Sequence, residues 1–445
     1  MEAPSWLTAQ FLVNAVTIVA VVHIMLISLA YCVYAERKVC SYIQDRIGPN
    51  RTGFDFGLPI LKPLRGMLGL GQSLADGLKF ILKEDYTPNR VDKVLFTLAP
   101  GLVIVPALMG FIVIPWGGWV DIPTFSILGM QIQGGIVHVT GANVNIGIVY
   151  LLSIASLGVY GVTLGGFASN NKFSFLGGIR ATAQMISYEI PLGLMILCVL
   201  LTVGTIVPDQ IVRHQIEHGW LIFHQPLTAL VFFITILAEA NRAPFDNAEA
   251  EQELVAGYHT EYSAMRMALF LLAEYGHLMT SAAFFALLFL GGYQLLPFMH
   301  DPLTSPAAVS VGAVLVKLAV FFGKVFGLIG VAMFVRWTIP RLRFDQIMHG
   351  AWQMVIPLSL VLVVSVSVLV YFGATGLLPM LGVNLSIALL FTMLLPLMPR
   401  REVNKRLPLY GSRFSPMPGE RVSTAPTLAL AIEDRPVEGS HATMT

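Results

Sequence analysis

Carboxylates are concentrated in one short stretch of the sequence, residues 238–262, which reads AEANRAPFDNAEAEQELVAGYHTEY. Only 12% of the residues of the whole chain are charged. The stretch nevertheless contains Glu239, Asp246, Glu249, Glu251, Glu253 and Glu261. It joins two long apolar segments, so we expect these acids where a membrane protein meets water. Carboxylates are costly near a bilayer, and a dense set of them therefore predicts the handling of protons or cations.

The spacing of the acids predicts a helical face. Asp246, Glu249 and Glu253 follow one another at i, i+3 and i+7, with Glu251 on the other side. Like charges this close are costly to ionise together, so some of their pKa values should rise toward neutral pH, as a proton relay requires. A solvated acidic loop is the simpler interpretation of an isolated acidic run. Here acids continue into a flanking apolar segment as Glu274, which favours the relay.

Ionisable side chains also lie inside the apolar segments. Glu189 stands in QMISYEIP, just before a proline that frees a backbone carbonyl. A carboxylate at that depth costs about 2.5–3.5 kcal/mol on insertion scales, so it has either an interior role or a snorkelling side chain. Lys317 and Lys324 are seven residues apart, on one face of a later segment. They need partners or water, and pairing with a buried Glu is the hypothesis, with snorkelling as the alternative.

A polar patch, Glu274, Tyr275 and His277, interrupts the apolar sequence LLAEYGHLM. Glu274 and His277 are one helical turn apart and could share a proton. A lone histidine in a membrane helix more often makes a helix–helix hydrogen bond, so His277 stays outside the predicted site.

Composition predicts the scaffold that must position these groups. Of the 445 residues, 56% are hydrophobic, which is typical of polytopic helical membrane proteins. The chain has no basic stripe for nucleic acid, and its three cysteines have no metal-ligand or disulfide spacing. The apolar windows long enough to cross a bilayer are 11–35, 94–115, 143–167, 185–207, 222–240, 267–290, 308–335, 352–373 and 379–398. We therefore predict an all-α polytopic membrane protein with about nine transmembrane helices.

Charge distribution predicts the orientation. Nearly all of the 27 Lys and Arg residues fall in the connections on one side of these segments and in the C-terminal tail. The positive-inside rule then places the N-terminus outside and the C-terminus in the cytoplasm. In the long first inner connection, 58–82 is expected to form interfacial amphipathic helices. We expect a membrane core over 1–373, an extra helix at 379–398 and a disordered cytoplasmic tail at 399–445.

Six motifs, in order along the chain, resemble those of the H-subunit family of respiratory complex I, the proton-pumping NADH–quinone oxidoreductase. They are ERKVCSYIQDRIGPNR at 36–51, SLADGLKFILKE at 73–84, ISYEIP at 186–191, the acid-rich stretch at 238–262, FLLAEY at 270–275 and PRLRFDQIM at 340–348. The long acid motif is the most specific of them. The resemblance implies a subunit that forms much of the quinone access tunnel and starts the carboxylate chain coupling quinone reduction to proton translocation.

Carried over residue by residue, the resemblance implies two sets of site residues. The quinone tunnel would use Glu36, Arg37, Arg46, Asp76, Glu274, Arg336, Arg341 and Arg343. Proton coupling would use Glu189, Glu239, Asp246, Glu249, Glu251, Glu253 and Glu261. We add Lys324 to the coupling set because of its position inside a span. No catalytic or metal-binding residue is expected in this chain.

The resemblance also implies cofactors, partners and location. Quinone, either ubiquinone or menaquinone, would be the substrate, with FMN and iron–sulfur clusters only in partner subunits. Expected partners are the peripheral cluster-bearing and quinone-site subunits, the small membrane subunits, the antiporter-like subunits and the lipid bilayer, with no nucleic acid. The expected location is the bacterial plasma membrane.

The chain departs from the family pattern at LPILKPLRGML, apparently an insertion within 54–70, and at Ser73, where proline is usual. Two alternatives remain open. A homologous membrane subunit of a hydrogenase or formate hydrogenlyase would not need the tunnel motifs. A stand-alone ion or proton transporter would be expected to show internal repeats, and none is visible by eye.

Overall fold

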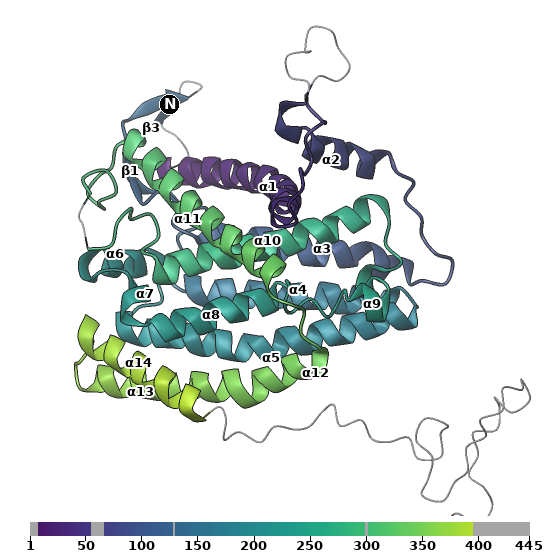
Figure 1. Ribbon diagram of the computed structural model, residues 1–445. Helices are drawn as coiled ribbons and strands as arrows, with labels where there is room; N and C mark the ends of the chain where they lie inside the picture. Colours follow the sequence, from purple (N-terminus) through teal and green to yellow (C-terminus); the bar gives the residue numbers. More distant parts are fainter. Residues whose placement is uncertain (1–7, 55–65, 128–129, 299–300, 395–445) are drawn as a thin grey trace, which may run out of the picture. The chain divides into compact units, whose positions relative to one another are not determined.

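The computed structural model describes residues 8–54, 66–127, 130–298 and 301–394 of the chain. The chain divides into two units, Met1–Phe391 and Thr392–Thr445, and the contacts given below lie within the first. Long helices make up most of this part of the protein (Figure 1). The predicted tail at 399–445 and much of the predicted insertion, at 55–65, lie outside the described residues.

Eight helices in the described part are long and apolar enough to cross a membrane. They are α1 (Ala9–Ile43), α3 (Lys93–Met109, continued by the 3-10 turn η3, Gly110–Val113), α4 (Gly147–Ala168), α5 (Lys172–Val203), α10 (Ala264–Phe289), α11 (Val311–Thr338), the continuous run of α12 (Phe344–His349), the π-helical η5 (Gly350–Val355) and α13 (Ile356–Tyr371), and α14 (Leu377–Leu394). A shorter apolar helix is α8, Pro226–Glu239. Each overlaps a predicted window, so the predicted all-α polytopic fold is confirmed.

The connections carry short elements at the two ends of the helices. The short helices and turns are α2 (Gln72–Leu82), α6 (Pro208–His218), α7 (Leu221–His224), α9 (Glu251–Leu254), η2 (Met67–Gly69) and η4 (Gly257–His259). The strands β1 (Trp119–Ile122) and β4 (Gly135–His138) pair antiparallel, as do β2 (Phe125–Ile127) and β3 (Met130–Ile132). In Figure 1 the strands, α6 and α7 lie at one end and α2 and α9 at the other. The acid-rich loop therefore lies at the α2 end.

Local sequence explains where the long helices begin and end. The Asn171 side chain accepts a hydrogen bond from the amide of Phe173 and caps the start of α5. Gly204 ends the same helix with a left-handed backbone at φ 77°. Asp92 caps α3 in the same way, by accepting from the amides of Val94 and Leu95. These caps satisfy backbone groups that the helix itself leaves unpaired.

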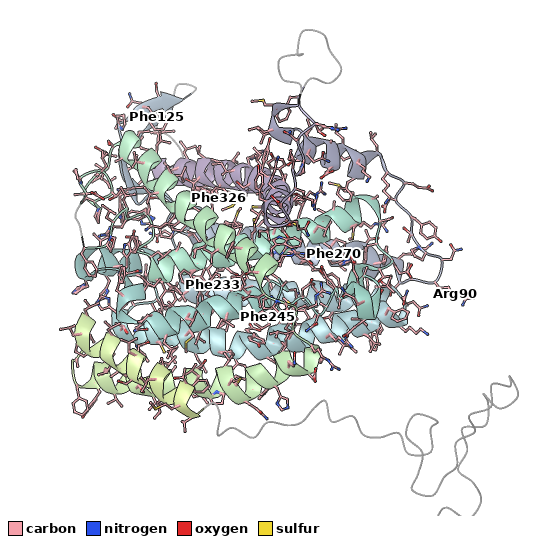
Figure 2. All side chains as sticks on the ribbon, viewed as in Figure 1. Arg90, Phe125, Phe233, Phe245, Phe270 and Phe326 are labelled. Atoms are coloured by element: carbon pink, nitrogen blue, oxygen red, sulfur yellow. The ribbon has the colours of Figure 1, made fainter. Side chains whose placement is uncertain are left out.

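Helix α10 is the most enclosed of the candidate spans, with 78% of its apolar window buried. It packs against α1, α3, α8 and α11, while α5 packs against α4, α8 and α13. Aromatic side chains pack together in this interior. Phe270 of α10, labelled in Figure 2, lies edge-on to Tyr258 and to Tyr262, with ring centroids 5.4 and 4.7 Å apart. The buried carboxylate of Glu274 on α10 therefore faces protein rather than lipid.

The acid-rich stretch is not the helix that its spacing predicted. Of these three acids only Glu253 lies in a helix, the short α9 (Glu251–Leu254), whereas Asp246 and Glu249 lie in irregular backbone. The prediction that Asp246, Glu249 and Glu253 share one helical face is therefore wrong.

Tertiary contacts explain this departure. Gln184 of α5 donates hydrogen bonds of 2.8 Å to the carbonyls of both Ala238 and Phe245, which holds the loop against the helix. At Gly257, where φ is +59°, an added Cβ would lie only 1.8 Å from the carbonyl oxygen of Ala248. The glycine thus lets the chain fold back on itself. Such contacts override the local pattern of charge spacing.

Candidate functional site

A cavity of about 540 Å³ lies where α1 and α11 end and α10 begins, beside the acid-rich loop. This volume lies within the range of small-molecule sites. Its lining residues are Val33, Glu36, Arg37, Cys40, Ser41, Arg46, Gly48, Pro49, Arg242, Glu249, Leu271, Glu274, Tyr275, Arg336 and Trp337. Apolar and strongly polar side chains thus share one wall, which suits a ligand with an apolar body and a polar end.

The predicted tunnel residues fall into two groups. The structure brings Glu36, Arg37, Arg46, Glu274 and Arg336 together in the cavity lining. Asp76 of α2 contacts this group through an ion pair with Arg37, in which a carboxylate oxygen lies 2.7 Å from Nη1 of the arginine.

Arg341 and Arg343 do not line the cavity. Arg341 donates to a carboxylate oxygen of Asp246 at 2.6 Å, and Nε of Arg343 lies 3.6 Å from Asp345. Arg341 therefore contacts the acid-rich loop, where its positive charge pairs with the buried carboxylate of Asp246. Burial raises the pKa of Asp246, while the Arg341 charge acts in the opposite direction.

Glu36 is a buried carboxylate with basic partners on two sides. Its Oε1 lies 2.5 Å from Nη1 of Arg336, and its Oε2 lies 3.5 Å from Nη1 of Arg242. The Tyr275 hydroxyl also donates a hydrogen bond to it. These partners come from α11, the acid-rich loop and α10, so the carboxylate of α1 joins three segments that are distant in the sequence. A buried charge needs such partners to offset its desolvation.

Arg242 was not among the predicted site residues, yet it lies between the carboxylates of Glu36 and Glu274. Its guanidinium lies 3.8 Å from the centroid of the Tyr275 ring, and Nη2 lies 3.8 Å from an oxygen of Glu274. Burial alone would lower the pKa of Arg242, but Tyr275 and the neighbouring carboxylates raise it above its usual value. Its Nε is buried without a hydrogen-bond partner among the described residues. The only sequence signal was a single arginine inside the acid motif.

Tyr258 links two acids beyond the arginine, and it too was missed. Its hydroxyl lies 2.7 Å from an oxygen of Glu274 and 3.4 Å from an oxygen of Glu249. Burial, followed by the nearby Glu274, raises the pKa of Glu249 well above its usual value. Burial also lowers the pKa of His259, whose Nδ1 lies 3.6 Å from Glu249. Burial and the nearby Glu274 thus both favour the protonated form of Glu249.

A second group of acids lies farther along the helices. Glu189 of α5 accepts a hydrogen bond from the hydroxyl of Ser156 on α4. Its helix packs against α8, and its charge acts on the buried carboxylate of Glu239 at the end of α8. Glu239 lines a small cavity of about 30 Å³ together with His277 of α10. The structure thus brings these two predicted coupling acids together inside the helical core.

The other predicted coupling acids lie toward the surface. Glu251 is exposed, and Glu253 is half-exposed and paired with Arg180 at 2.6 Å. Glu261 accepts a hydrogen bond of 2.7 Å from Asn171. Their described contacts fix the loop and the start of α5 and do not reach the cavity.

Lysines 317 and 324 do not form the predicted pair with a buried glutamate. Lys324 donates three hydrogen bonds to the carbonyls of Leu290, Gly292 and Gln294, just past the end of α10. Lys317 donates to the carbonyl of Ala308 at 2.7 Å. Both ammonium groups lie toward the end of α10 opposite the acid-rich loop. Their contacts are those of cations that stabilise backbone carbonyls.

The sequence model of the family described as NADH dehydrogenase matches residues 16–367. Among similar proteins, the H subunit of the NADH-quinone oxidoreductase of Flavobacterium psychrophilum is 40% identical over 353 residues, which is 79% of this chain and 95% of the relative. The corresponding protein of Cytophaga hutchinsonii is 41% identical over 362 residues, covering 81% and 96%. The corresponding protein of Geobacter sulfurreducens is 41% identical over 363 residues, again covering 81% and 96%.

Proposed function

The chain belongs to the NADH dehydrogenase family as a membrane subunit of NADH–quinone oxidoreductase, and we propose that it forms the quinone access path of that enzyme and starts its proton-coupling chain. The observation that carries the proposal is the cavity at the ends of α1, α10 and α11. Charged side chains line this cavity, and two of them, Glu274 and Glu249, are joined through the hydroxyl of Tyr258.

The lining fits a quinone better than a fully polar ligand. Val33, Leu271 and Trp337 offer apolar surface, and α1 and α11 are candidate membrane spans, so a quinone could enter from the bilayer. Guanidinium groups, including those of Arg46 and Arg242, can donate hydrogen bonds to the ring oxygens. The buried Nε of Arg242 has no other described partner, which leaves a donor for such an oxygen.

Reduction of a quinone changes the charge and proton demand inside the cavity. The first groups to respond are those on the wall, because electrostatic effects are strong where water is excluded. Glu274 lies on that wall, and Tyr258 joins it to Glu249. We propose that the response passes from this cluster to Glu239 and Glu189 and then to antiporter-like partner subunits.

The remaining assignments complete the proposal. Quinone, whether ubiquinone or menaquinone, is the substrate, and the FMN and iron–sulfur clusters reside in partner subunits. The protein acts in the bacterial plasma membrane with its N-terminus outside and its C-terminus in the cytoplasm. This places the cavity and the acid-rich loop at the cytoplasmic side, where peripheral partner subunits can deliver electrons.

Blocking the cavity tests the access path. Leu271→Trp fills a lining position of α10, whereas Met265→Trp adds the same bulk at an exposed position of that helix. We expect Leu271→Trp to lower quinone-linked NADH oxidation in native membranes and to leave ferricyanide-linked oxidation unchanged. Met265→Trp should change neither. Equal quinone-linked rates in the two variants would contradict the access path.

Two carboxamide substitutions test the coupling chain. Glu189→Gln and Glu249→Gln keep the shape of the side chain and remove its proton chemistry. We expect the complex to assemble, the artificial-acceptor activity to persist and the quinone-linked rate to fall. Unchanged quinone-linked turnover in both variants would remove the coupling assignment.

A further inference from the structure

The small cavity beside Glu239 contains an imidazole that the proposed coupling chain does not use. His277 is buried on α10, and its ring nitrogens have no side-chain hydrogen-bond partner among the described residues. It lines the cavity together with Glu239, Thr280 and Ser281. Thr280 already donates to backbone carbonyls at 2.9 Å, so Glu239, His277 and Ser281 are the polar groups left facing the space.

The surroundings keep this imidazole in place. On α4, a Cβ added at Gly158 would lie 3.3 Å from Nε2 of His277, so the glycine leaves room for the ring. Ala107 contributes a small apolar surface, the backbone of Ala155 faces the imidazole as a hydrogen-bonding group, and Phe232 closes another side. The pocket is therefore a partly enclosed, mostly apolar space with polar groups on a few sides.

Its size and chemistry suit water. The volume of about 30 Å³ exceeds the roughly 10–15 Å³ that one buried water needs. A buried water also needs two to four polar partners, which the carboxylate of Glu239, the imidazole of His277 and the hydroxyl of Ser281 supply. An empty cavity would leave these polar groups unsatisfied at considerable cost.

The position of His277 connects the two acid groups of the site. It follows Glu274 by one turn of α10, and side chains so spaced are neighbours on a helix surface. Glu274 forms one group with Tyr258 and Glu249 beside the large cavity, and we call this group the Glu274 cluster. Glu239 belongs to the other group, together with Glu189. Within the described residues, no direct hydrogen bond joins these two groups.

We propose that His277 and water in this small cavity form the proton-transfer link between the Glu274 cluster and Glu239. The imidazole accepts a proton on one ring nitrogen and releases a proton from the other, so its own charge is restored after each transfer. Water carries the released proton to the Glu239 carboxylate. The inference rests on the proposed coupling function and adds a residue and a solvent site to it.

The test uses the assembled complex in native membranes with three readouts: ferricyanide-linked NADH oxidation, quinone-linked oxidation and NADH-driven proton uptake. His277→Asn keeps a polar side chain that cannot carry a proton. We expect normal ferricyanide activity and a loss of proton uptake of about tenfold or more, since a positioned proton-transfer group commonly accelerates its step by roughly 10²-fold. The solvent deuterium isotope effect on quinone-linked turnover should also rise, which a merely structural role would not cause.

Two further variants make the result decisive. His23→Asn is the matched control, because His23 is a histidine of a candidate span whose hydrogen bond among the described residues is to its own helix, at Val19. It should behave as the unmodified protein does. Ala155→Val narrows the cavity and leaves His277 intact. We expect it to lower proton uptake as well, and it decides the matter if His277→Asn fails to assemble.

The outcomes separate this inference from the proposed function. If assembled His277→Asn or Ala155→Val pumps within about twofold of the unmodified protein while Glu239→Gln does not, the link through His277 is overturned and the coupling function stands. If Glu239→Gln, Glu249→Gln and His277→Asn all pump normally, the coupling function itself fails.

Discussion

Arg242→Met is the substitution that most directly tests the organisation of the site. The side chain of Arg242 lies between Glu36 and Glu274, at 3.5 and 3.8 Å, and stacks on Tyr275 with 3.8 Å to the ring centroid. Methionine keeps an unbranched apolar stem and removes the guanidinium. Glu36 would retain Arg336, whereas Glu274 would keep only hydrogen-bonding and weaker electrostatic partners.

The expected size of the effect follows from burial. Removing one partner of a buried ion pair usually costs about 3–5 kcal/mol, because the other charge stays desolvated. The lost cation–π contact is worth about 2 kcal/mol in a desolvated setting, and this energy is part of the 3–5 kcal/mol rather than an addition to it. At about 1.4 kcal/mol per factor of ten, 3–5 kcal/mol corresponds to a loss of roughly 10²- to 4 × 10³-fold in the population of the assembled, active form. Arg242→Lys keeps the charge and loses the planar stack, so its effect should be closer to tenfold.

The assay must separate assembly from quinone chemistry. Assembled complex is first quantified on native gels by NADH-dependent staining, and quinone-linked turnover per assembled complex is then measured over a range of soluble quinone. Arg266→Met is the control, since Arg266 pairs with Asp85 at 3.2 Å and lies 5.4 Å from the Phe96 ring but is less buried. Its loss should be about 1 kcal/mol or less. Arg242→Met that assembles and turns over within about twofold of the unmodified protein would refute the reasoning.

Three further predictions follow from other contacts. Burial and then Glu274 raise the pKa of Glu249 well above 4.5, so its ionisation costs stability as pH rises from 4.5 through the higher folded value. Glu249→Gln mimics the protonated acid, and its melting temperature should exceed that of the unmodified protein increasingly at alkaline pH and not at pH 4; an equal difference at both would contradict this. Lys324→Met leaves three buried carbonyls without their donor, so we expect a loss of about 1–3 kcal/mol in thermal unfolding with normal quinone-linked turnover per complex. A selective loss of turnover would instead support the predicted role of Lys324 in proton coupling. Arg37→Asp should weaken quinone-linked activity and the double exchange with Asp76→Arg should recover part of it, whereas an exchange no better than the single variant would show that the 2.7 Å pair is incidental.

The membrane-spanning helices could be predicted from the sequence because their signal is local. An apolar run of sufficient length is unstable in water and stable in a bilayer whatever its neighbours are. The predicted window 222–240 shows the limit of this rule, since the structure divides it into α7 and α8. Pro226 begins α8 after the irregular backbone of Gln225, a break that apolar content alone does not reveal.

The acid-rich loop could not be predicted in the same way. Its charge spacing indicated a helix, but its conformation depends on Gln184 from α5 and on the close approach of Gly257 to Ala248. Both are contacts between parts of the chain that meet only after folding. The sequence therefore located a dense set of carboxylates but predicted the wrong local arrangement for Asp246, Glu249 and Glu253.

The site residues likewise divide into those with a local sequence signal and those whose role depends on tertiary contacts. The predicted tunnel residues that line the cavity, such as Glu36 and Arg46, lie on conspicuous charged motifs next to apolar segments. Arg242 and Tyr258 have no such local mark. Their importance arises because they contact carboxylates contributed by α1, α10 and the acid-rich loop. Such roles arise because residues from different segments meet in the folded protein, and the spacing of residues along one helix does not predict these contacts.

Arg242 gives the site a physical means of transmitting a change in charge. It already divides its interactions between Glu36 and Glu274, so a new negative charge in the cavity would compete with Glu274 for the guanidinium. At 3.8 Å and an effective dielectric constant near 20, one such pair is worth about 4 kcal/mol. Losing that attraction would favour a proton on the Glu274–Tyr258–Glu249 group by an energy equivalent to several factors of ten. If the proposed function holds, a displacement of this single side chain is sufficient to link a charge change in the cavity to proton uptake at this wall.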